Sequence, residues 1–549
     1  MNIIHMKKVY TVLAAFLHIS LTIAQLPNNR TFTNLDIGEV DARIYSDGNL
    51  FQDIVNNAPA FEVPKGSNSF SIYASTFWMT ALGQKNGYDN ISYAYDKFGQ
   101  ENLFATGPID IVNQTKSLDP QFQRLWKVNR FTVNNHIQNW NSLNYTVPAE
   151  IADWPGNGNA NTAQQLAPFK DLDNDGIYEP QNGEYPEILG DQAVYLIANT
   201  QNVVTNDSTP QGPDSVIYSG LYIEFHAMLY AFQSNVPAIS NTVFANVKLY
   251  NRSLSSIGDH QDFKFSVFTD FDLGNWDDDY IGTDTAKNMY YAYNGDGFDE
   301  AFGGRAGYGT NYPAQGVKFL DSKLDHTVYF MNGSAGNGFP FFPSHHAGFQ
   351  RGKWKNGGSM FYGGDGLSYC VDTNQRVRHM YTGNPNTVPN QWTEKTPCAT
   401  NAMSNPPGER RMAGGPNLPS QFNHGTSITF NYAYIFAQQS GVFSAPVAKL
   451  SLVADTVQNF FNSTIVGINE VEKQDFLAFE LFPNPARDEI KLKLSEEKFE
   501  VSVFKLNGSL IKRIRNQKTI DISDLDAGMY FIRIENNNVI GIKKLIVVE

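Results

Sequence analysis

Apolar and charged residues alternate most regularly in the stretch Glu489-Ile490-Lys491-Leu492-Lys493-Leu494. Successive side chains of a strand point to opposite faces of the sheet, so Ile490, Leu492 and Leu494 share one face and the two lysines share the other. The stretch therefore predicts a strand that buries one face against a core and presents the other face to water.

The residues that follow this strand repeat the same pattern to the end of the chain. Further strands are predicted over residues 501–504, 519–525, 529–535 and 539–548. Asn507-Gly508 favours a tight hairpin, because both residue types tolerate a positive φ. Short strands at this spacing predict a small, Ig-like antiparallel β-sandwich over residues 476–549, preceded by a linker at 466–475.

Four motifs in this region occur in the order in which a known family carries them. They are Leu481-Phe482-Pro483-Asn484-Pro485-Ala486, Asn507-Gly508, Leu525-Asp526-Ala527-Gly528-Met529-Tyr530 and Lys543-Lys544-Leu545-Ile546-Val547. On these motifs the region resembles the type IX secretion system C-terminal sorting domain, type A (the Por secretion tail). The resemblance implies a sorting motif made of Pro483, Asn484, Pro485, Gly528, Tyr530, Lys543 and Lys544. It also implies that the type IX secretion machinery carries the rest of the chain, the passenger, across the outer membrane, to be attached to the cell surface or released.

The beginning of the chain predicts the first step of such an export route. Residues 1–8 include two lysines, and a largely apolar run follows over residues 9–23. With small residues at 22 and 24, this pattern predicts a secretory signal peptide, residues 1–24, cleaved near Ala24. The alternative is a membrane anchor, but a span needs about 20 apolar residues, and this run is shorter and contains polar residues. We expect passage through the periplasm and a mature chain without a transmembrane span.

The passenger consists of short runs of strand-forming residues separated by Gly, Asn, Asp, Ser and Pro. These runs lie at residues 69–78, 194–198, 215–232, 241–250, 263–271, 326–331 and 427–437. Their spacing predicts an all-β passenger of one or two β-sandwich or jelly-roll-like domains. A soft boundary at 207–214 separates a part at 25–210, which holds an Asp-rich loop, from a part at 211–465. Through the stretches at residues 280–284, 309–316, 362–364 and 408–411, the passenger also resembles uncharacterised exported proteins that bear the same tail. This resemblance leaves its function open.

Composition excludes two other classes of protein. Hydrophobic residues make up 41% of the chain and charged residues 17%, which is typical of folded modules and not of a disordered chain. The net charge of −14 argues against a nucleic-acid partner, because phosphate recognition needs an excess of Lys and Arg.

The most specific chemical motif is Asp171-Leu172-Asp173-Asn174-Asp175-Gly176-Ile177-Tyr178-Glu179. It resembles the calcium loops of EF-hand, dockerin and thrombospondin type 3 repeats, in which alternate carboxylates converge on a hard cation and a glycine permits the turn. The motif predicts a Ca²⁺ site made of Asp171, Asp173, Asp175, Glu179 and the carbonyl group of Ile177. The twelfth position is Asn182 instead of a bidentate Glu, and Glu184 follows two residues later, so a complete EF-hand is not expected. A solvated acidic turn is the alternative.

A second acidic region spans residues 270–284. Asp270 and Asp272 share one face of a predicted strand, where two like charges repel unless a cation or a proton separates them. One interpretation is a metal site made of Asp270, Asp272, Asp278 and Asp284. Paired carboxylates also serve as acid and base in glycoside hydrolases. A solvated loop with capping aspartates is the third alternative.

The remaining residues with chemical potential are cysteines and aromatics. Cys370 and Cys398 are the only cysteines, and an oxidising compartment allows a disulfide between them. Four aromatic residues lie in predicted loops, namely Trp276, Trp354, Tyr362 and Trp392. They are expected to form either a sugar-stacking platform or part of the core. The chain lacks the sequence signatures of zinc proteases, serine hydrolases, phosphate loops and dinucleotide-binding folds.

The sequence therefore predicts an exported β-sandwich protein, secreted or attached to the cell surface, whose passenger binds Ca²⁺ and takes part in adhesion or glycan binding. An extracellular glycan or a matrix protein is the expected partner. The alternative is a secreted hydrolase that acts on polysaccharide with carboxylates from residues 270–284.

Overall fold

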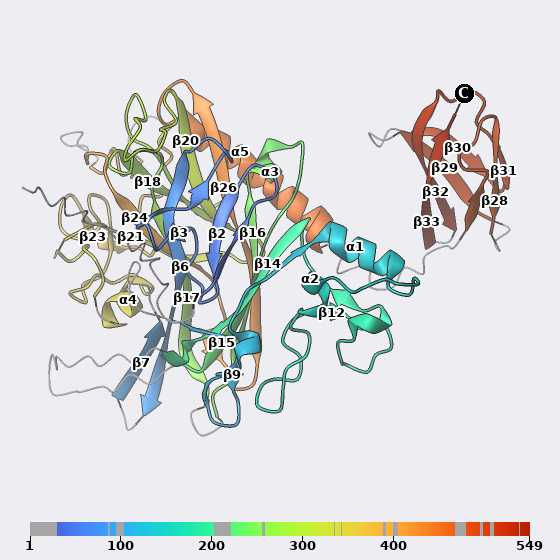
Figure 1. The fold of residues 1–549 in the computed structure, drawn as a ribbon. Coiled ribbons are helices and arrows are strands. Elements are labelled where there is room, and N and C mark those ends of the chain that lie inside the picture. Colours follow the sequence, from blue (N-terminus) through green and yellow to red (C-terminus); the bar gives the residue numbers. More distant parts are fainter. Residues whose placement is uncertain are drawn as a thin grey trace, which may run out of the picture. The chain divides into compact units, whose positions relative to one another are not determined.

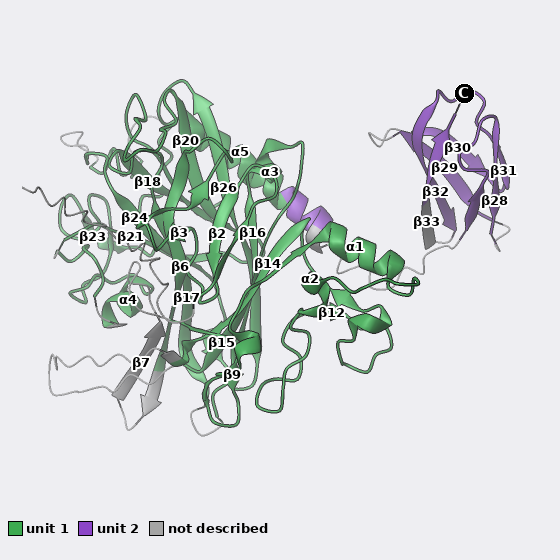
Figure 2. Ribbon diagram, in the orientation of Figure 1, with its two compact units in different colours: residues 1–458 green, residues 459–549 purple. Residues whose placement is uncertain are grey.

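The structure is a computed structural model. It describes residues 30–85, 88–94, 104–202, 221–254, 258–333, 335–341, 343–387, 391–398, 405–466, 479–494, 498–505, 510–536 and 539–548. The predicted signal peptide (1–24), the soft boundary at 207–214 and the Asn507-Gly508 hairpin lie outside these residues, as does the predicted linker after residue 466. The chain divides into two compact units, residues 1–458 and 459–549 (Figure 2).

The first sheet of unit 1 is antiparallel and combines strands from both halves of the passenger. Its strands, in spatial order, are β1 (Phe32–Leu35), β2 (Asp41–Tyr45), β5 (Phe61–Glu62), β6 (Phe70–Lys85), β17 (His260–Phe271), β24 (Arg410–Pro416) and β21 (Leu324–Phe330). In addition, β7 (Tyr88–Ala94) pairs with β6, and β25 (Gln421–Phe422) pairs with β17.

The second sheet of unit 1 is antiparallel as well. Its strands, in spatial order, are β11 (Trp126–Asn129), β14 (Gln192–Asn199), β15 (Ile223–Ala231), β16 (Val243–Asn251), β26 (Ser427–Ser440), β20 (Asn311–Phe319), β19 (Met289–Asn294) and β18 (Asp279–Asp284). A short strand, β8 (Ala105–Thr106), pairs with β14. The alternation predicted for residues 241–250 is present in β16, where Val247 and Leu249 are buried and Asn246 and Lys248 are partly exposed.

Side chains from both sheets form one hydrophobic core. The Ser75 hydroxyl on β6 lies 2.7 Å from the Tyr434 hydroxyl on β26, and the Tyr290 hydroxyl on β19 donates a hydrogen bond of 2.7 Å to the Val267 carbonyl on β17. The all-β sandwich class is confirmed. Strands from before residue 207 and after residue 214 pair in both sheets, so early (blue) and late (orange) segments lie in one body (Figure 1).

Shorter elements connect the strands of the two large sheets. Two-residue and five-residue strands form the pairs β3 (Gln52–Asp53) with β4 (Ala58–Pro59), β9 (Ile109–Asp110) with β10 (Thr115–Lys116), β12 (Phe169–Lys170) with β13 (Tyr185–Pro186), and β22 (Phe361–Tyr362) with β23 (Asp372–Arg376). The α-helices are α1 (Arg130–Asn139), α2 (Ala149–Ala152), α3 (Pro237–Ser240), α4 (Pro343–Phe349) and α5 (Ala445–Phe460). Single turns are η2 (Pro120–Phe122), η3 (Pro180–Asn182), η4 (Thr200–Asn202) and the π-helical η5 (Phe461–Val466). Every helix in the described part is too short or too polar to cross a bilayer.

Helix α5 has no counterpart among the predicted elements. Its buried side chains recur at helical spacing and are Pro446, Val447, Leu450, Val453, Ala454 and Val457. This periodicity, in which buried positions recur three or four residues apart, is the signal in the sequence that indicates the helix. Leu450 packs over β20, where a Cβ atom added to Gly316 would lie 3.3 Å from its Cδ2.

The C-terminal unit has two small antiparallel sheets and a core of its own. One sheet has the order β27 (Glu480–Phe482), β28 (Glu489–Lys493), β31 (Thr519–Asp521), and the other has the order β30 (Leu510–Arg515), β29 (Glu500–Lys505), β32 (Gly528–Asn536), β33 (Val539–Val547). Ile490, Leu492 and Leu494 are buried in this core, as their alternation predicts. The exposed lysines of β28 lie on the opposite face.

Candidate functional site

The Asp-rich loop is closed at its base by the ladder of β12 and β13, in which Lys170 pairs with Tyr185. Within the loop, Asp171 accepts hydrogen bonds from the backbone N–H groups of Asn174 (2.7 Å) and Gly176 (2.9 Å). Asn174 and Gly176 have φ values of 64° and 78°, the left-handed conformation that Asn and Gly adopt most readily. The residue types of the motif therefore match the backbone turns that the loop makes.

The loop gathers carboxylates into two overlapping groups. Ligand oxygens of Asp171, Asp173 and Glu184 lie within 4.8 Å of one another, and so do those of Asp173, Asp175 and Glu179. Asp173 belongs to both groups and is exposed. These oxygens could hold one hard cation, which prefers several carboxylate ligands.

Glu184 is the member of this loop that the predicted ligand set omits. It is 2% exposed, and its two oxygens accept hydrogen bonds from the backbone N–H groups of Leu172 (2.9 Å) and Glu179 (2.7 Å). The carboxylate thus spans the loop from one side to the other. Ile177, predicted as a carbonyl ligand, is exposed and donates its N–H to Asp175 at 2.7 Å.

Asp270 and Asp272 line a cavity of about 300 Å³ beside the end of β17, which we call the carboxylate cleft. Its lining residues are Asn57, Tyr73, Asp270, Asp272, Trp276, Phe302, Arg305, Glu409 and Arg411. Strand register places Arg411 of β24 directly opposite Asp270, and the two side chains form an ion pair at 3.2 Å. Arg305 approaches Asp272 at 3.9 Å. At Asp270 and Asp272, two of the predicted metal ligands, the positive charge is therefore supplied by arginine.

The Asp270 and Asp272 carboxyl groups of the cleft hold their protons more tightly than exposed aspartates do. Burial raises the pKa of Asp270 to about 7, although Arg411 opposes this shift. Burial also raises the pKa of Asp272 well above its usual range, and the neighbouring Asp270 carboxylate raises it further. A protonated carboxyl group therefore persists in the cleft near neutral pH.

Two aromatic rings flank these polar groups. Trp276 is partly exposed, and its ring lies 5.8 Å from that of Phe302, which is 45% exposed. Trp354 and Trp392 are buried in the core instead, where each indole N–H donates a hydrogen bond to a backbone carbonyl. Tyr362 is partly buried and packs against Trp392 at 4.9 Å. The four predicted aromatics therefore do not form one platform, and Trp276 is the member that lines the cleft.

The other predicted ligands of the second acidic region lie apart from this cleft. Asp284 ends β18 and accepts a hydrogen bond of 3.0 Å from the Lys287 N–H. Oxygens of Asp278, Asp296 and Glu300 lie within 4.8 Å of one another. The sequence predicts one metal site made of Asp270, Asp272, Asp278 and Asp284. Among the described residues, the convergent carboxylate groups include only Asp278 of these four. Burial raises the pKa of Asp278 to about 8, and the nearby Asp299 adds to this shift.

A larger cavity of about 470 Å³ lies over the second sheet, next to the Asp-rich loop. Asp171, Tyr195, His226 and Lys248 are among its lining residues. The Tyr195 hydroxyl lies 2.9 Å from Nδ1 of His226 and donates to the Leu166 carbonyl at 2.9 Å, while Nε2 of His226 lies 3.0 Å from Glu224. Each side-chain polar atom of Tyr195, His226 and Glu224 thus has a partner within the protein, which is typical of a structural hydrogen-bond network.

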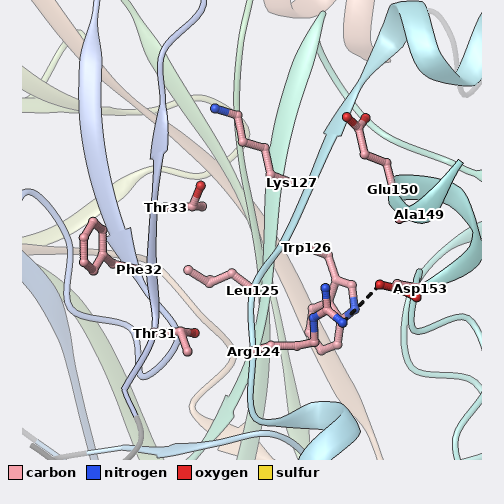
Figure 3. Close-up of a pocket in the computed structure, with 10 residues that line it drawn as sticks. All are labelled: Thr31, Phe32, Thr33, Arg124, Leu125, Trp126, Lys127, Ala149, Glu150 and Asp153. Atoms are coloured by element: carbon pink, nitrogen blue, oxygen red, sulfur yellow. Dashed lines mark hydrogen bonds and ion pairs between the residues drawn. The ribbon is translucent and has the colours of Figure 1, made fainter. Parts of the chain in front are cut away.

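Figure 3 shows a further cavity, of about 400 Å³, between β1, β11 and α2. Arg124 and Asp153 form an ion pair of 3.1 Å at its edge, and both side chains are nearly half exposed. Lys127 reaches across to Asp36 at 2.6 Å. Exposed ion pairs of this kind hold neighbouring segments together weakly, and they present no concentrated charge to a ligand.

The structure joins Cys370 and Cys398 by a disulfide with a Cα–Cα distance of 5.6 Å.

In the C-terminal unit, Asn484 binds the β33 backbone twice, because its amide donates to the Lys544 carbonyl (2.7 Å) and accepts from the Ile546 N–H (2.8 Å). The Tyr530 hydroxyl donates to the Asp526 carbonyl at 2.8 Å. Gly528 begins β32, Lys543 and Lys544 are exposed on β33, and Pro483 and Pro485 flank Asn484.

Residues 480–548 match the sequence model of a family described as the secretion system C-terminal sorting domain. No curated protein matches the chain. Among solved structures, a polysaccharide lyase is similar over 62% of this chain and 36% of its own length, at 10% sequence identity and a TM-score of 0.17. A likeness at this TM-score carries no conclusion about the passenger. The chain therefore carries a type IX secretion system C-terminal sorting domain at residues 480–548 and is an exported protein of the cell surface or the medium.

Proposed function

We propose that the exported passenger is a calcium-binding protein that recognises extracellular glycans in the carboxylate cleft. The observation that carries this proposal is the composition of the cleft. Carboxylates and guanidinium groups provide hydrogen-bond acceptors and donors for sugar hydroxyls, and the rings of Trp276 and Phe302 provide apolar surface beside them. A small number of oriented polar groups next to aromatic rings is typical of small-molecule and sugar sites.

The Asp-rich loop is proposed to bind Ca²⁺ as a stabilising ion. Its carboxylates converge, Glu184 is already held by two backbone N–H groups, and Asp171 also lines the cavity over the second sheet. A cation that binds only the folded loop stabilises it by mass action. The ion would thus keep residues 171–184 ordered against the second sheet.

Glycan binding is tested with the full exported chain, a panel of neutral and acidic polysaccharides, and the matrix proteins collagen and fibronectin. We expect at least one polysaccharide to bind, and Phe302→Ala to weaken that binding about tenfold, because the ring contributes contact area in the cleft. Phe131→Ala is the matched control, because Phe131 is 82% exposed on α1, outside the cleft. Equal losses for both variants, or no binding of any polysaccharide, would overturn the proposal.

Calcium binding is tested by thermal unfolding with and without a chelator. At a free Ca²⁺ concentration of about 100 times Kd, the ion should add about 2.7 kcal/mol to the free energy of unfolding. Asp173→Ala should remove this calcium-dependent part. Asp372→Ala is the control, because Asp372 is exposed like Asp173 and makes the same local hydrogen bond. Asp372 accepts from the Asn374 N–H at 3.0 Å, as Asp173 accepts from the Asp175 N–H at 3.2 Å. Identical melting curves with and without calcium in the unmodified protein would contradict the assignment.

A second candidate function, a polysaccharide hydrolase, is favoured by one observation. Asp270 and Asp272 line the same cleft. Burial raises the pKa of Asp272 well above its usual range, so Asp272 keeps its proton, whereas Asp270, paired with Arg411 and with a pKa of about 7, is partly ionised at neutral pH. A carboxyl group that keeps its proton near neutral pH can protonate a leaving oxygen while a second carboxylate acts as base or nucleophile.

The two functions differ in what happens to the bound polysaccharide. Ligand mass is followed over time with the unmodified protein and with Asp270→Asn and Asp272→Asn. Binding with unchanged mass supports recognition alone. Saturable release of fragments, abolished by either substitution, would establish the hydrolase.

A further inference from the structure

Five carboxylates meet at one end of the hairpin formed by β18 and β19. Asp278 and Asp279 lie at the start of β18, and three more acids follow β19 in the turn that ends at Glu300, namely Asp296, Asp299 and Glu300 itself. Because Asp279 pairs with Asn294 across the antiparallel ladder, these two segments are neighbours. Oxygens of Asp278, Asp296 and Glu300 lie within 4.8 Å of one another.

Two buried oxygens of this cluster lack a hydrogen-bond donor. Asp278 is 5% exposed; its Oδ2 accepts from the Asn275 side chain at 3.2 Å, whereas Oδ1 has no donor. Asp279 is fully buried; its Oδ2 accepts from the Leu273 N–H at 3.1 Å, and Oδ1 has no donor. In the described part of the chain, no Lys, Arg or His forms an ion pair with any of the five acids. Buried polar atoms are nearly always satisfied, so Oδ1 of Asp278, the buried member of the convergent group of three, indicates a missing positive partner.

The backbone around the cluster is fitted closely to the acids. Asp299 accepts hydrogen bonds from the N–H groups of Asn275 (2.9 Å) and Tyr308 (2.8 Å), which fixes its carboxylate. A Cβ atom added to Gly274 would lie 2.3 Å from Asp299 Oδ2, and one added to Gly295 would lie 2.4 Å from the Asp278 carbonyl oxygen. Glycine is therefore required at both positions for the two turns to approach each other, as in a preformed binding site.

We propose that this cluster is a second cation site, in which Asp278, Asp296 and Glu300 bind Ca²⁺. Oxygen ligands of this number and charge suit a hard divalent cation, and the exposed positions of Asp296 and Glu300 leave room for water in the coordination shell. The ion would tie the turn at 273–279, which carries Trp276, to the turn at 294–300. It would thereby hold one wall of the carboxylate cleft in place. The site shares no ligand with the loop at 171–184 and does not depend on it.

The test counts the calcium ions bound by the full chain, by titration calorimetry with CaCl₂ alone. Asp278→Asn should bind one ion fewer than the unmodified protein, because the amide keeps the shape of the side chain but removes its charge. Asp296→Ala should lose the same ion, and since Asp296 is exposed this variant is expected to fold normally. Asp284→Asn, at the other end of β18, is the control and should bind as many ions as the unmodified protein.

The two calcium sites are separated by combining variants. Asp173→Ala and Asp278→Asn should each lose one ion, and the double variant should lose both. If the loop at 171–184 does not bind calcium, Asp173→Ala has no effect while Asp278→Asn still loses an ion. Unchanged stoichiometry and affinity in both Asp278→Asn and Asp296→Ala would overturn the second site, whatever the loop does.

Discussion

Glu224 illustrates how unlike two buried acids of one protein can be. It is fully buried on β15, yet it accepts hydrogen bonds from Arg252 (2.8 Å), the Ile109 N–H (2.7 Å) and His226 (3.0 Å). Although burial opposes ionisation, these partners hold the pKa of Glu224 at about 2. Asp270, equally buried but with Arg411 as its cation, has a pKa of about 7. The number of donors decides which acid stays ionised.

A pH dependence follows from Glu224. Its folded pKa is lowered from 4.5 to about 2, so the stability that it contributes is complete above pH 4.5 and is lost as the pH falls toward 2. Chemical denaturation should show Glu224→Gln less stable than the unmodified protein by up to about 3 kcal/mol at neutral pH. The difference should shrink steadily between pH 4.5 and 2. The exposed Glu39→Gln serves as control, and a Glu224→Gln deficit that is independent of pH would contradict this reasoning.

Helix α5 shows how an element of the passenger is fixed by its packing. Its buried side chains follow one stripe, and Leu450 in that stripe is fully buried near Gly316 of β20. Leu452, two residues later, lies on the other side of the helix and is 62% exposed. Two residues advance a helix by about 200°, so Leu450 and Leu452 lie on opposite faces of α5. Both substitutions to alanine change helix propensity equally, so a difference in their effects measures the packing of Leu450.

Leu450→Ala should therefore destabilise the protein and Leu452→Ala should not. Removing a fully buried leucine side chain costs about 2–5 kcal/mol, because both transfer energy and a cavity contribute. An exposed leucine on the same helix should change the free energy of unfolding by less than about 0.5 kcal/mol. Urea unfolding of both variants measures the contrast, and equal effects would show that α5 does not depend on its buried stripe.

The molecule as a whole consists of a passenger and a sorting domain, each with its own hydrophobic core. The sorting domain joins the Asn484 loop to β33 through both hydrogen bonds of the Asn484 amide. Residues that the sequence resemblance assigns to the sorting motif thus lie at a defined place in the sandwich, on and beside β33.

Export provides the prediction for the complete chain. Deletion of residues 479–549 should leave the passenger in the periplasm, since the sorting domain addresses it to the type IX machinery. Asn484→Ala should also lower the amount of passenger that reaches the cell surface, because it removes the two hydrogen bonds that hold the Asn484 loop to β33. Cell fractionation and immunoblotting of the passenger measure both, with the exposed Lys491→Ala as control. Surface delivery at normal levels without the tail would contradict this role.

Much of this architecture was accessible from the sequence, because it depends on neighbours along the chain. The alternation at residues 489–494 and at 241–250 predicts the faces that β28 and β16 bury. The spacing of Asp171, Asp173 and Asp175 predicts the loop that the structure contains, since Asx turns and glycine conformations are local. Helix α5 also has a local signal, the helical spacing of its buried residues, but the surrounding sequence has the short strand-forming runs of a β-sandwich.

The composition of the sites was decided only by tertiary structure. Strand register sets Arg411 opposite Asp270 across 141 positions of sequence, and a loop brings Arg305 to Asp272. Hairpin pairing brings Asp296 and Glu300 to Asp278 and leaves Asp284 at the far end of the same strand. Sequence by itself determined the sorting domain, the all-β class and the Asp-rich loop, which rest on short-range patterns. The partners and protonation of each buried acid were determined by sheet pairing and burial, which join residues that are distant in the chain.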